Sequence, residues 1–240
     1  MTHQALINEI TQELCGDENV LALLLYGSFA RHEENANSDI DLMIITNEMF
    51  LQKWHEVRYG ITIEFLEMHL SFLKKFIKEN EVPMYFALTE GVILFDKNSG
   101  IESLITEAKK ILAAGPPVNE KWKNEKYKIK KRFELTEIYS DLLDIDDEVV
   151  FNYVASLLIA NAIPLLLENN NLWPQSRKRT LNHLKSQCYE GYKYIEILLN
   201  PSSSLPEKRC AMKKLTEYVL QPYGGILEGD VLIFKKEGIS

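Results

Sequence analysis

A short apolar run that ends in a glycine and a serine is the first feature of this chain that could do chemistry. Residues 20–26 predict a buried strand, and Gly27 and Ser28 interrupt the apolar pattern before a helix-compatible segment begins at Phe29. A helix start leaves backbone N–H groups free at the positive end of the helix dipole, and glycine lets an anion approach them closely. Ser28 can add a hydroxyl donor and Arg31 a positive charge. The pattern therefore indicates a phosphate site.

Three carboxylates follow this turn, and the two segments that contain them are predicted to be strands. Asp39 and Asp41 are two residues apart in the segment 38–45, so their side chains are expected on one face of a strand. Glu64 lies in the segment 59–66, which is rich in β-branched and aromatic residues, and its phase is opposite to that of the apolar residues. Carboxylates suit Mg²⁺ that also holds phosphate, and paired metal ions can activate an attacking oxygen and stabilise a leaving one.

Each of these features is common by itself. A Gly-Ser pair after a strand is usually an ordinary turn, and an Asp-x-Asp pair in a strand more often marks a solvated edge. Here the turn, the arginine, the aspartate pair and the strand glutamate occur in order within one short stretch of chain. Their joint occurrence favours a site that transfers a nucleotidyl group.

The motifs Gly27-Ser28-x-Ala30-Arg31 and Ser38-Asp39-Ile40-Asp41-Leu42 resemble the signature of the polymerase-β-like nucleotidyltransferase superfamily, especially its small bacterial branch that includes aminoglycoside and lincosamide nucleotidyltransferases. The resemblance implies a mixed α/β core. It also implies Mg²⁺-dependent attack of a substrate hydroxyl on the α-phosphorus of a nucleoside triphosphate, with pyrophosphate leaving. The resemblance is close over roughly the first hundred residues, and beyond them only the architecture is similar.

Carried over residue by residue, the resemblance implies a role for each matching position. Gly27 and Ser28 would hold the β- and γ-phosphates. Asp39 and Asp41 would hold two Mg²⁺ ions, and Glu64 would take the third carboxylate position. The expected donor is ATP.

Two parts of this site stay open at the level of sequence. Many relatives have glycine directly after the arginine, whereas His32 follows Arg31 here, so the local turn and the role of Arg31 are undecided. The attacking hydroxyl also needs an acceptor for its proton, and a carboxylate is the usual one. Glu90, Glu137 and Asp141 are the candidates, the last two lying one helical turn apart.

Composition indicates a globular chain and narrows the classes of partner. The 240 residues are 46% hydrophobic and 26% charged, and the formal net charge of −8 argues against extended nucleic-acid binding. An acidic surface suits a cationic acceptor such as an aminoglycoside, although many cytosolic proteins are acidic. Cys15, Cys188 and Cys210 lie far apart, which predicts free thiols in a reducing compartment. No secretory pattern is visible at the N-terminus, so cytoplasmic residence is expected.

Periodicity predicts two domains that meet at Gly115-Pro116-Pro117, where regular structure must stop. The first, residues 1–115, is expected to be the catalytic α/β domain, with further helices at 4–14, 71–80 and 101–114 and a strand at 91–95. The second, residues 118–240, is expected to be an antiparallel helical bundle that helps to form the acceptor cleft. Its predicted helices are 120–143, 146–168, 177–199 and 207–220.

Three segments of the second half have more than one interpretation. Residues 149–167 approach the length that spans a membrane, but Asn152, Asn161 and Pro164 interrupt them, which favours a buried helix. The basic run 121–132 is expected to be a solvated helix face, and the alternative is that some of its residues face the cleft and neutralise the triphosphate. The tail, residues 223–234, predicts either a small hairpin or a segment that drapes over the surface.

The sequence therefore predicts a mixed-sheet nucleotidyltransferase core followed by an all-α domain. The expected activity is transfer of AMP from ATP to a hydroxyl of a small, antibiotic-like molecule, by a monomer or homodimer without nucleic-acid or membrane partners. One alternative is AMP transfer to a protein side chain, as in antitoxin-like members that the motif also resembles. Another is a nucleotide-binding module without turnover, against which the retention of Asp39, Asp41 and Glu64 weighs.

Overall fold

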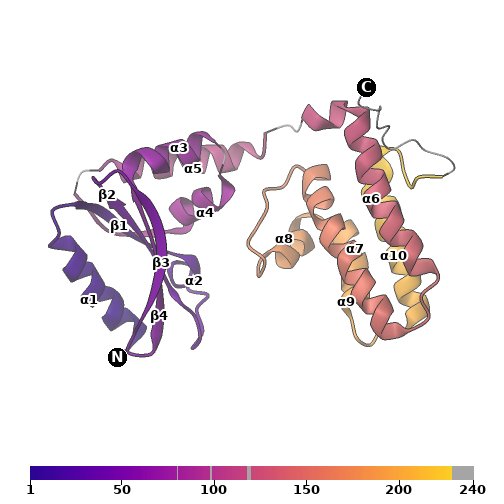
Figure 1. The fold of residues 1–240 in the computed structure, drawn as a ribbon, viewed down its shortest axis with the longest axis horizontal. Coiled ribbons are helices and arrows are strands. Elements are labelled where there is room, and N and C mark those ends of the chain that lie inside the picture. Colours follow the sequence, from indigo (N-terminus) through magenta and orange to yellow (C-terminus); the bar gives the residue numbers. More distant parts are fainter. Residues whose placement is uncertain (80, 98, 118–119, 229–240) are drawn as a thin grey trace, which may run out of the picture. The chain divides into compact units, whose positions relative to one another are not determined.

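The computed structural model describes the chain except for residues 80, 98, 118–119 and 229–240. The chain divides into two compact units, residues 1–114 and the residues from 115 onward (Figure 1). The division falls beside Gly115, which begins the second unit with a positive φ of 80°. Glycine adopts this left-handed conformation without the steric cost that other residues meet.

A five-stranded mixed sheet forms the centre of the first unit. Its strand order is β3-β4-β2-β1-β5; β2 and β4 are parallel, and the other neighbouring pairs are antiparallel. Tyr59 and Gly60 both have positive φ angles, so they form the tight turn between β3 and β4 that suits the twist of a hairpin. The strands are β1 (Val20–Tyr26), β2 (Ile40–Thr46), β3 (Leu51–Arg58), β4 (Ile61–His69) and β5 (Val92–Asp96).

Helices cover both faces of this sheet. Figure 1 shows α1 on one face and α3, α4 and α5 on the other. Leu6, Ile7 and Ile10 of α1 are buried against apolar residues of β1, β2 and β4, because they share one side of an amphipathic helix. The helices of this unit are α1 (His3–Cys15), α2 (Gly27–Ala30), α3 (Leu70–Lys78), α4 (Val82–Glu90) and α5 (Ile101–Ala114).

The second unit is helical throughout its described residues, apart from connecting segments. Helix α7 is long and apolar enough to cross a membrane by length and composition, and it supplies buried residues such as Phe151 and Leu158 to the core of this unit. Asp147 caps its N-terminus by accepting from the backbone N–H groups of Val149 and Val150. The elements are η1 (Glu120–Lys123), α6 (Glu125–Leu143), α7 (Glu148–Asn169), α8 (Thr180–Gln187), α9 (Tyr189–Leu199), α10 (Leu205–Leu220) and η2 (Gln221–Tyr223).

The predicted fold class, a mixed-sheet core followed by a helical region, is confirmed, but two predicted helices need correction. Residues 177–199 do not form one helix: the chain breaks at Cys188, whose φ is −143°, so the described part of the second unit has five α-helices rather than four. The break lets Gly191 lie so close to α7 that an added Cβ would be 2.6 Å from Leu166. Residues 120–143 divide into η1 and α6, and much of the predicted tail lies outside the described residues.

Candidate active site

Strand register brings two of the three predicted carboxylates together on one face of the sheet. Tyr26 of β1 is opposite Asp41 of β2, and Asp41 is beside Glu64 of β4. Residues that are paired across strands point to the same face, so these three side chains form a row. The hydroxyl of Tyr26 donates to Oε1 of Glu64 at 3.3 Å. Ile63 and Phe65 are buried on the opposite face, which confirms the predicted phase of Glu64.

Asp39 lies just outside this row. The strand was predicted to begin at Ser38, but β2 begins at Ile40, so Asp39 is an exposed residue that precedes the strand. Its negative charge still raises the pKa of Asp41, which means that the two carboxylates interact. The predicted pair therefore consists of one half-buried strand residue and one exposed residue at the strand entry.

Gly27 lies directly against Asp41 at the start of α2. Its φ of 72° is in the left-handed region, and a Cβ atom added to it would lie 1.9 Å from Oδ2 of Asp41. Both facts favour glycine at this position, because any other residue would meet backbone strain and an overlap with the carboxylate. The backbone carbonyl of Ser28 accepts from the N–H groups of Arg31 and Glu33, which closes the turn. The residues predicted to hold phosphate and metal are thus immediate neighbours.

Arg31 joins this turn to the end of α4. Its Nε is 2.8 Å from Oε2 of Glu33, and its Nη1 is 3.2 Å from Oε2 of Glu90. The guanidinium also lowers the pKa of Asp41 through its charge. Glu90, one of the three candidate bases, is therefore engaged by Arg31. The other two candidates, Glu137 and Asp141, are exposed on α6 in the second unit.

His32 occupies a position whose conformation suits glycine. Its φ is 57°, in the left-handed region that non-glycine residues adopt rarely. The substitution of histidine for the glycine found in many relatives therefore leaves the turn in a conformation that glycine would adopt without strain. Although the residue is histidine, its backbone keeps the left-handed conformation and does not adopt the right-handed helical one.

Asp41 is close to two other carboxylates, and the positive charges of Lys53 and Arg31 offset their negative charge only in part. Burial raises the pKa of Asp41 to about 6 from an ordinary 3.8, and the charges of Glu64 and Asp39 raise it further, against the lowering effects of Lys53 and Arg31. Burial also raises the pKa of Tyr26, together with the charges of Asp41 and Glu64 and the hydrogen bond to Glu64. A pKa shifted this far by burial and by neighbouring charges is typical of functional sites.

Lys53 is a member of the site that sequence patterns did not single out. It lies on β3, and its Nζ is 2.7 Å from Oε1 of Glu64. Strand β3 was not predicted, because it is an edge strand with polar residues and only partial burial. Residues 59–66 were predicted as one strand, but Tyr59 and Gly60 form the turn between β3 and β4, and β4 begins at Ile61.

The carboxylates fit a divalent cation by their chemistry. Asp39, Asp41 and Glu64 offer hard oxygen donors, and burial, followed by the charges of Glu64 and Asp39, raises the pKa of Asp41. Within the described residues, no group of three His, Cys, Asp or Glu side chains is already arranged to hold a metal ion. Glu64 is instead paired with Lys53, in an ion pair whose side chains are 32% and 58% exposed. Such exposed pairs contribute only about 0.2–1 kcal/mol, so Glu64 can exchange this partner readily.

Comparison with known proteins identifies a matching family and similar solved structures. Residues 8–100 match the model of the family described as Polymerase beta, Nucleotidyltransferase, and this range includes the predicted phosphate and metal residues but not the candidate bases Glu137 and Asp141. Among solved structures, the chain is similar to a nucleotidyltransferase-like protein from Exiguobacterium sibiricum 255-15. The identity is 16% and the TM-score 0.49, over 91% of this chain and 74% of that one. No curated protein matches the sequence significantly.

Proposed function

Because the first unit of this chain belongs to the polymerase-β-like nucleotidyltransferase superfamily, we propose that it transfers a nucleoside monophosphate, AMP from ATP, to a hydroxyl of a small molecule in a Mg²⁺-dependent reaction. The observation that carries this proposal is the position of Asp41, which lies between the Gly27 turn and Glu64. A cation bound by this carboxylate would lie close to phosphate groups held by the Gly27 turn. A small-molecule acceptor of the antibiotic class is part of the proposal, as is a cytoplasmic location.

In this proposal the residues of the site have separate tasks. The turn at Gly27 and Ser28 would hold the β- and γ-phosphates, and Asp39, Asp41 and Glu64 would hold the divalent cation, which would supply charge stabilisation to the attacking and leaving oxygens. The acceptor hydroxyl forms a bond to the α-phosphorus as the bond from that phosphorus to the bridging oxygen breaks. Pyrophosphate carries away the electron pair of the broken bond, and the hydroxyl proton passes to a base. Arg31 acts as a positioning residue, since its guanidinium is held by Glu33 and Glu90.

Two labelled forms of ATP test the reaction. With Mg²⁺ and a panel of hydroxylated acceptors, label on the α-phosphate should move to an acceptor, whereas label on the γ-phosphate should leave as pyrophosphate. Asp41→Asn should abolish both events, because it removes a charge that the cation requires. Transfer of the γ-label to an acceptor would instead show a kinase, and full turnover by Asp41→Asn would show that the carboxylate assignment is wrong.

One observation favours the alternative of a nucleotide-binding module without turnover. Lys53 already neutralises Glu64 in this structure, as it would in a protein that binds nucleotide and does not use the third carboxylate. In that case Glu64→Gln should leave nucleotide affinity unchanged, and no acceptor in the panel should receive the α-label. Loss of label transfer in Glu64→Gln would exclude the alternative.

A further inference from the structure

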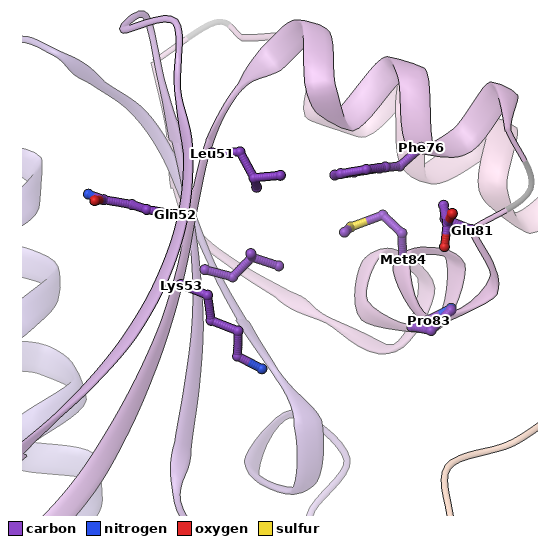
Figure 2. Close-up of a pocket in the computed structure, with 8 residues that line it drawn as sticks. Leu51, Gln52, Lys53, Phe76, Glu81, Pro83 and Met84 are labelled. Atoms are coloured by element: carbon purple, nitrogen blue, oxygen red, sulfur yellow. The ribbon is translucent and has the colours of Figure 1, made fainter.

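An apolar cavity lies beside the carboxylate row in the first unit. It has a volume of about 280 Å³ and lies between strands β3 and β4 and helices α3 and α4 (Figure 2). Figure 2 shows Leu51, Phe76 and Met84 pointing into the same space, with Lys53 beside them. Leu66 of β4 also lines the cavity. Apolar side chains with few polar groups at the edge are typical of a site for a small ligand.

Lys53 connects this cavity to the candidate active site. Its side chain lines the cavity, and its Nζ is 2.7 Å from Oε1 of Glu64. In Figure 2 the amino group is turned away from Leu51, Phe76 and Met84. The cavity and the carboxylate are thus separated by little more than the length of one lysine side chain. A group seated in the cavity would extend directly toward Glu64.

The strand order fixes the side from which an attacking group would come. Across the sheet, the Gly27 turn follows β1, Asp41 is on β2, Glu64 on β4 and Lys53 on β3. In an in-line displacement the attacking oxygen approaches opposite the leaving group. If the Gly27 turn holds the leaving pyrophosphate, the acceptor must approach from the side of β4 and β3. Residues of β3 and β4 line the cavity, so it lies on that side.

We propose that this cavity binds an uncharged, ring-bearing part of the acceptor and so directs the acceptor hydroxyl toward Glu64 and Asp41. This inference rests on the proposed function for the direction of attack. An apolar cavity of about 150 Å³ can hold benzene, so the volume here suits one ring with a short substituent or two fused rings. Phe76 and Met84 offer an aromatic face and a polarisable sulfur that favour contact with a ring.

The charges at the edge of the cavity argue against a polycation as its occupant. Glu81 is the one carboxylate among the lining residues, and it is exposed. Lys53 adds a positive charge on the other side. The acidic net charge of the chain made a cationic acceptor plausible from sequence, but the cavity offers no concentrated negative charge to receive one. Its chemistry selects acceptors by apolar contact.

Binding of a simple probe tests this proposal without turnover. The full chain is labelled with ¹³C in its methionine methyl groups, and the Met84 signal is assigned from Met84→Leu. 2-Phenylethanol, which combines a ring with a hydroxyl, is titrated in the presence of Mg²⁺ and a non-hydrolysable ATP analogue. We expect a saturable shift of the Met84 signal, and no shift with glycerol, which has hydroxyls but no ring.

A pair of matched variants sharpens the result. Leu51 and Val92 are 44% and 46% exposed on edge strands, but only Leu51 lines the cavity. Leu51→Trp should fill the cavity and weaken binding of 2-phenylethanol about tenfold or more, whereas Val92→Trp should leave it unchanged. Equal affinity in both variants, or no Met84 shift in the wild type, would overturn the proposal. So would a Met84 shift caused by the ATP analogue alone that blocks 2-phenylethanol, because the cavity would then belong to the donor base.

The outcome is independent of whether the chain transfers nucleotides. Absence of α-label transfer would contradict the proposed function and leave the binding result as it stands. Binding of the probe with active transfer, but with equal turnover of ring-bearing and ring-free acceptors, would contradict the role of the cavity in acceptor choice. Lower turnover of ring-bearing acceptors in Leu51→Trp, with ring-free acceptors unaffected, would support it.

Discussion

The absence of a Cβ atom at Gly27 leaves the space that the carboxylate of Asp41 occupies. An added Cβ at Gly27 would be 1.9 Å from Oδ2 of Asp41, so Gly27→Ala must displace the carboxylate as well as strain a backbone with φ of 72°. We expect α-label transfer to fall about a hundredfold, because a displacement of about 1 Å at reacting groups has effects of that order. Steady-state kinetics with labelled ATP measures the loss.

Gly60 provides the matched control for this substitution. Its φ is 78°, but nothing lies within 4 Å of the position that a Cβ would take. Gly60→Ala should therefore lose about 1 kcal/mol of stability from backbone strain alone and keep its activity. If both variants retained full turnover, close contact between the turn and Asp41 would have no role in the reaction.

Asp41 should also make stability depend on pH in a direction unusual for an aspartate. Its pKa is raised to about 6 from 3.8, so the folded state binds a proton more tightly than the unfolded state. The resulting stabilisation is complete below about pH 4 and is lost as the pH rises through 6. Two pKa units correspond to about 3 kcal/mol, but Asp41 is only half-buried, and solvent screening reduces the effect to the order of 1 kcal/mol.

Urea unfolding of Asp41→Asn measures this effect. The variant should be more stable than the wild type at pH 7, and the difference should disappear near pH 4. Mg²⁺ should stabilise the wild type at pH 7 and leave the variant unchanged. Asp141→Asn, an exposed carboxylate on α6, serves as the control and should show neither response. A wild type that gains stability between pH 4 and 6 relative to Asp41→Asn would show that the carboxylate is stabilised in its charged form.

The roles of the predicted site residues stay predictions, but local pattern was sufficient for part of their placement. Gly27 and Ser28 end an apolar run, and the phase of Glu64 was predicted from its neighbours Ile61 and Ile63. Lys53 was not predicted as part of the site, because it lies on β3, an edge strand that the sequence pattern did not indicate. The hydroxyl of Tyr26 was not predicted either, because it reaches Glu64 from a strand that is distant in sequence. Pairing of that kind depends on strand order, which no local pattern specifies.

At the scale of elements, the same distinction separates correct predictions from wrong ones. Helix α5 was predicted at 101–114 and is found at Ile101–Ala114, because its apolar spacing and the glycine after it are local signals. Strand β3 was missed because one edge is unpaired and its residues are mostly polar. The break at Cys188 was missed because the packing that accompanies it, the close approach of Gly191 to Leu166 of α7, joins residues that are distant in sequence.

The contact between helices α7 and α10 can be tested through the stability of Lys208 variants. Lys208 of α10 is only 2% exposed, and its Nζ is 2.9 Å from Oδ1 of Asn152 and 3.2 Å from Oε1 of Glu148, both on α7. Lys208→Ala should destabilise the chain by about 2–4 kcal/mol, because it leaves a cavity and removes the link between the helices. Lys208→Met keeps most of the buried stem, so it should cost less than half as much.

Urea unfolding followed by circular dichroism at 222 nm compares these variants. Lys213→Ala is the control, since Lys213 lies on the same helix with its side chain 61% exposed and should be nearly neutral. Equal losses in Lys208→Ala and Lys213→Ala would mean that the buried lysine contributes nothing to the joining of the two helices.

At the scale of the whole molecule, the family match and the candidate active site both lie in the first of the two units. The family match ends at residue 100, and Gly27, Asp41, Glu64 and the apolar cavity all lie in that unit. The second unit has its own core, built around α7, and its place in the acceptor cleft is still a prediction. The family match therefore supports nucleotidyl transfer in general, and both the donor and the acceptor belong to the proposal.

Metal binding in the presence of nucleotide tests the central claim most directly. Mn²⁺, which replaces Mg²⁺ and is visible by electron paramagnetic resonance, is titrated into the full chain with the α,β-methylene analogue of ATP. The carboxylate row predicts that Asp41→Asn and Glu64→Gln each weaken Mn²⁺ binding about tenfold or more, whereas Asp141→Asn has no effect. Unchanged Mn²⁺ affinity in Asp41→Asn and Glu64→Gln would contradict the claim that these carboxylates hold the metal–nucleotide complex.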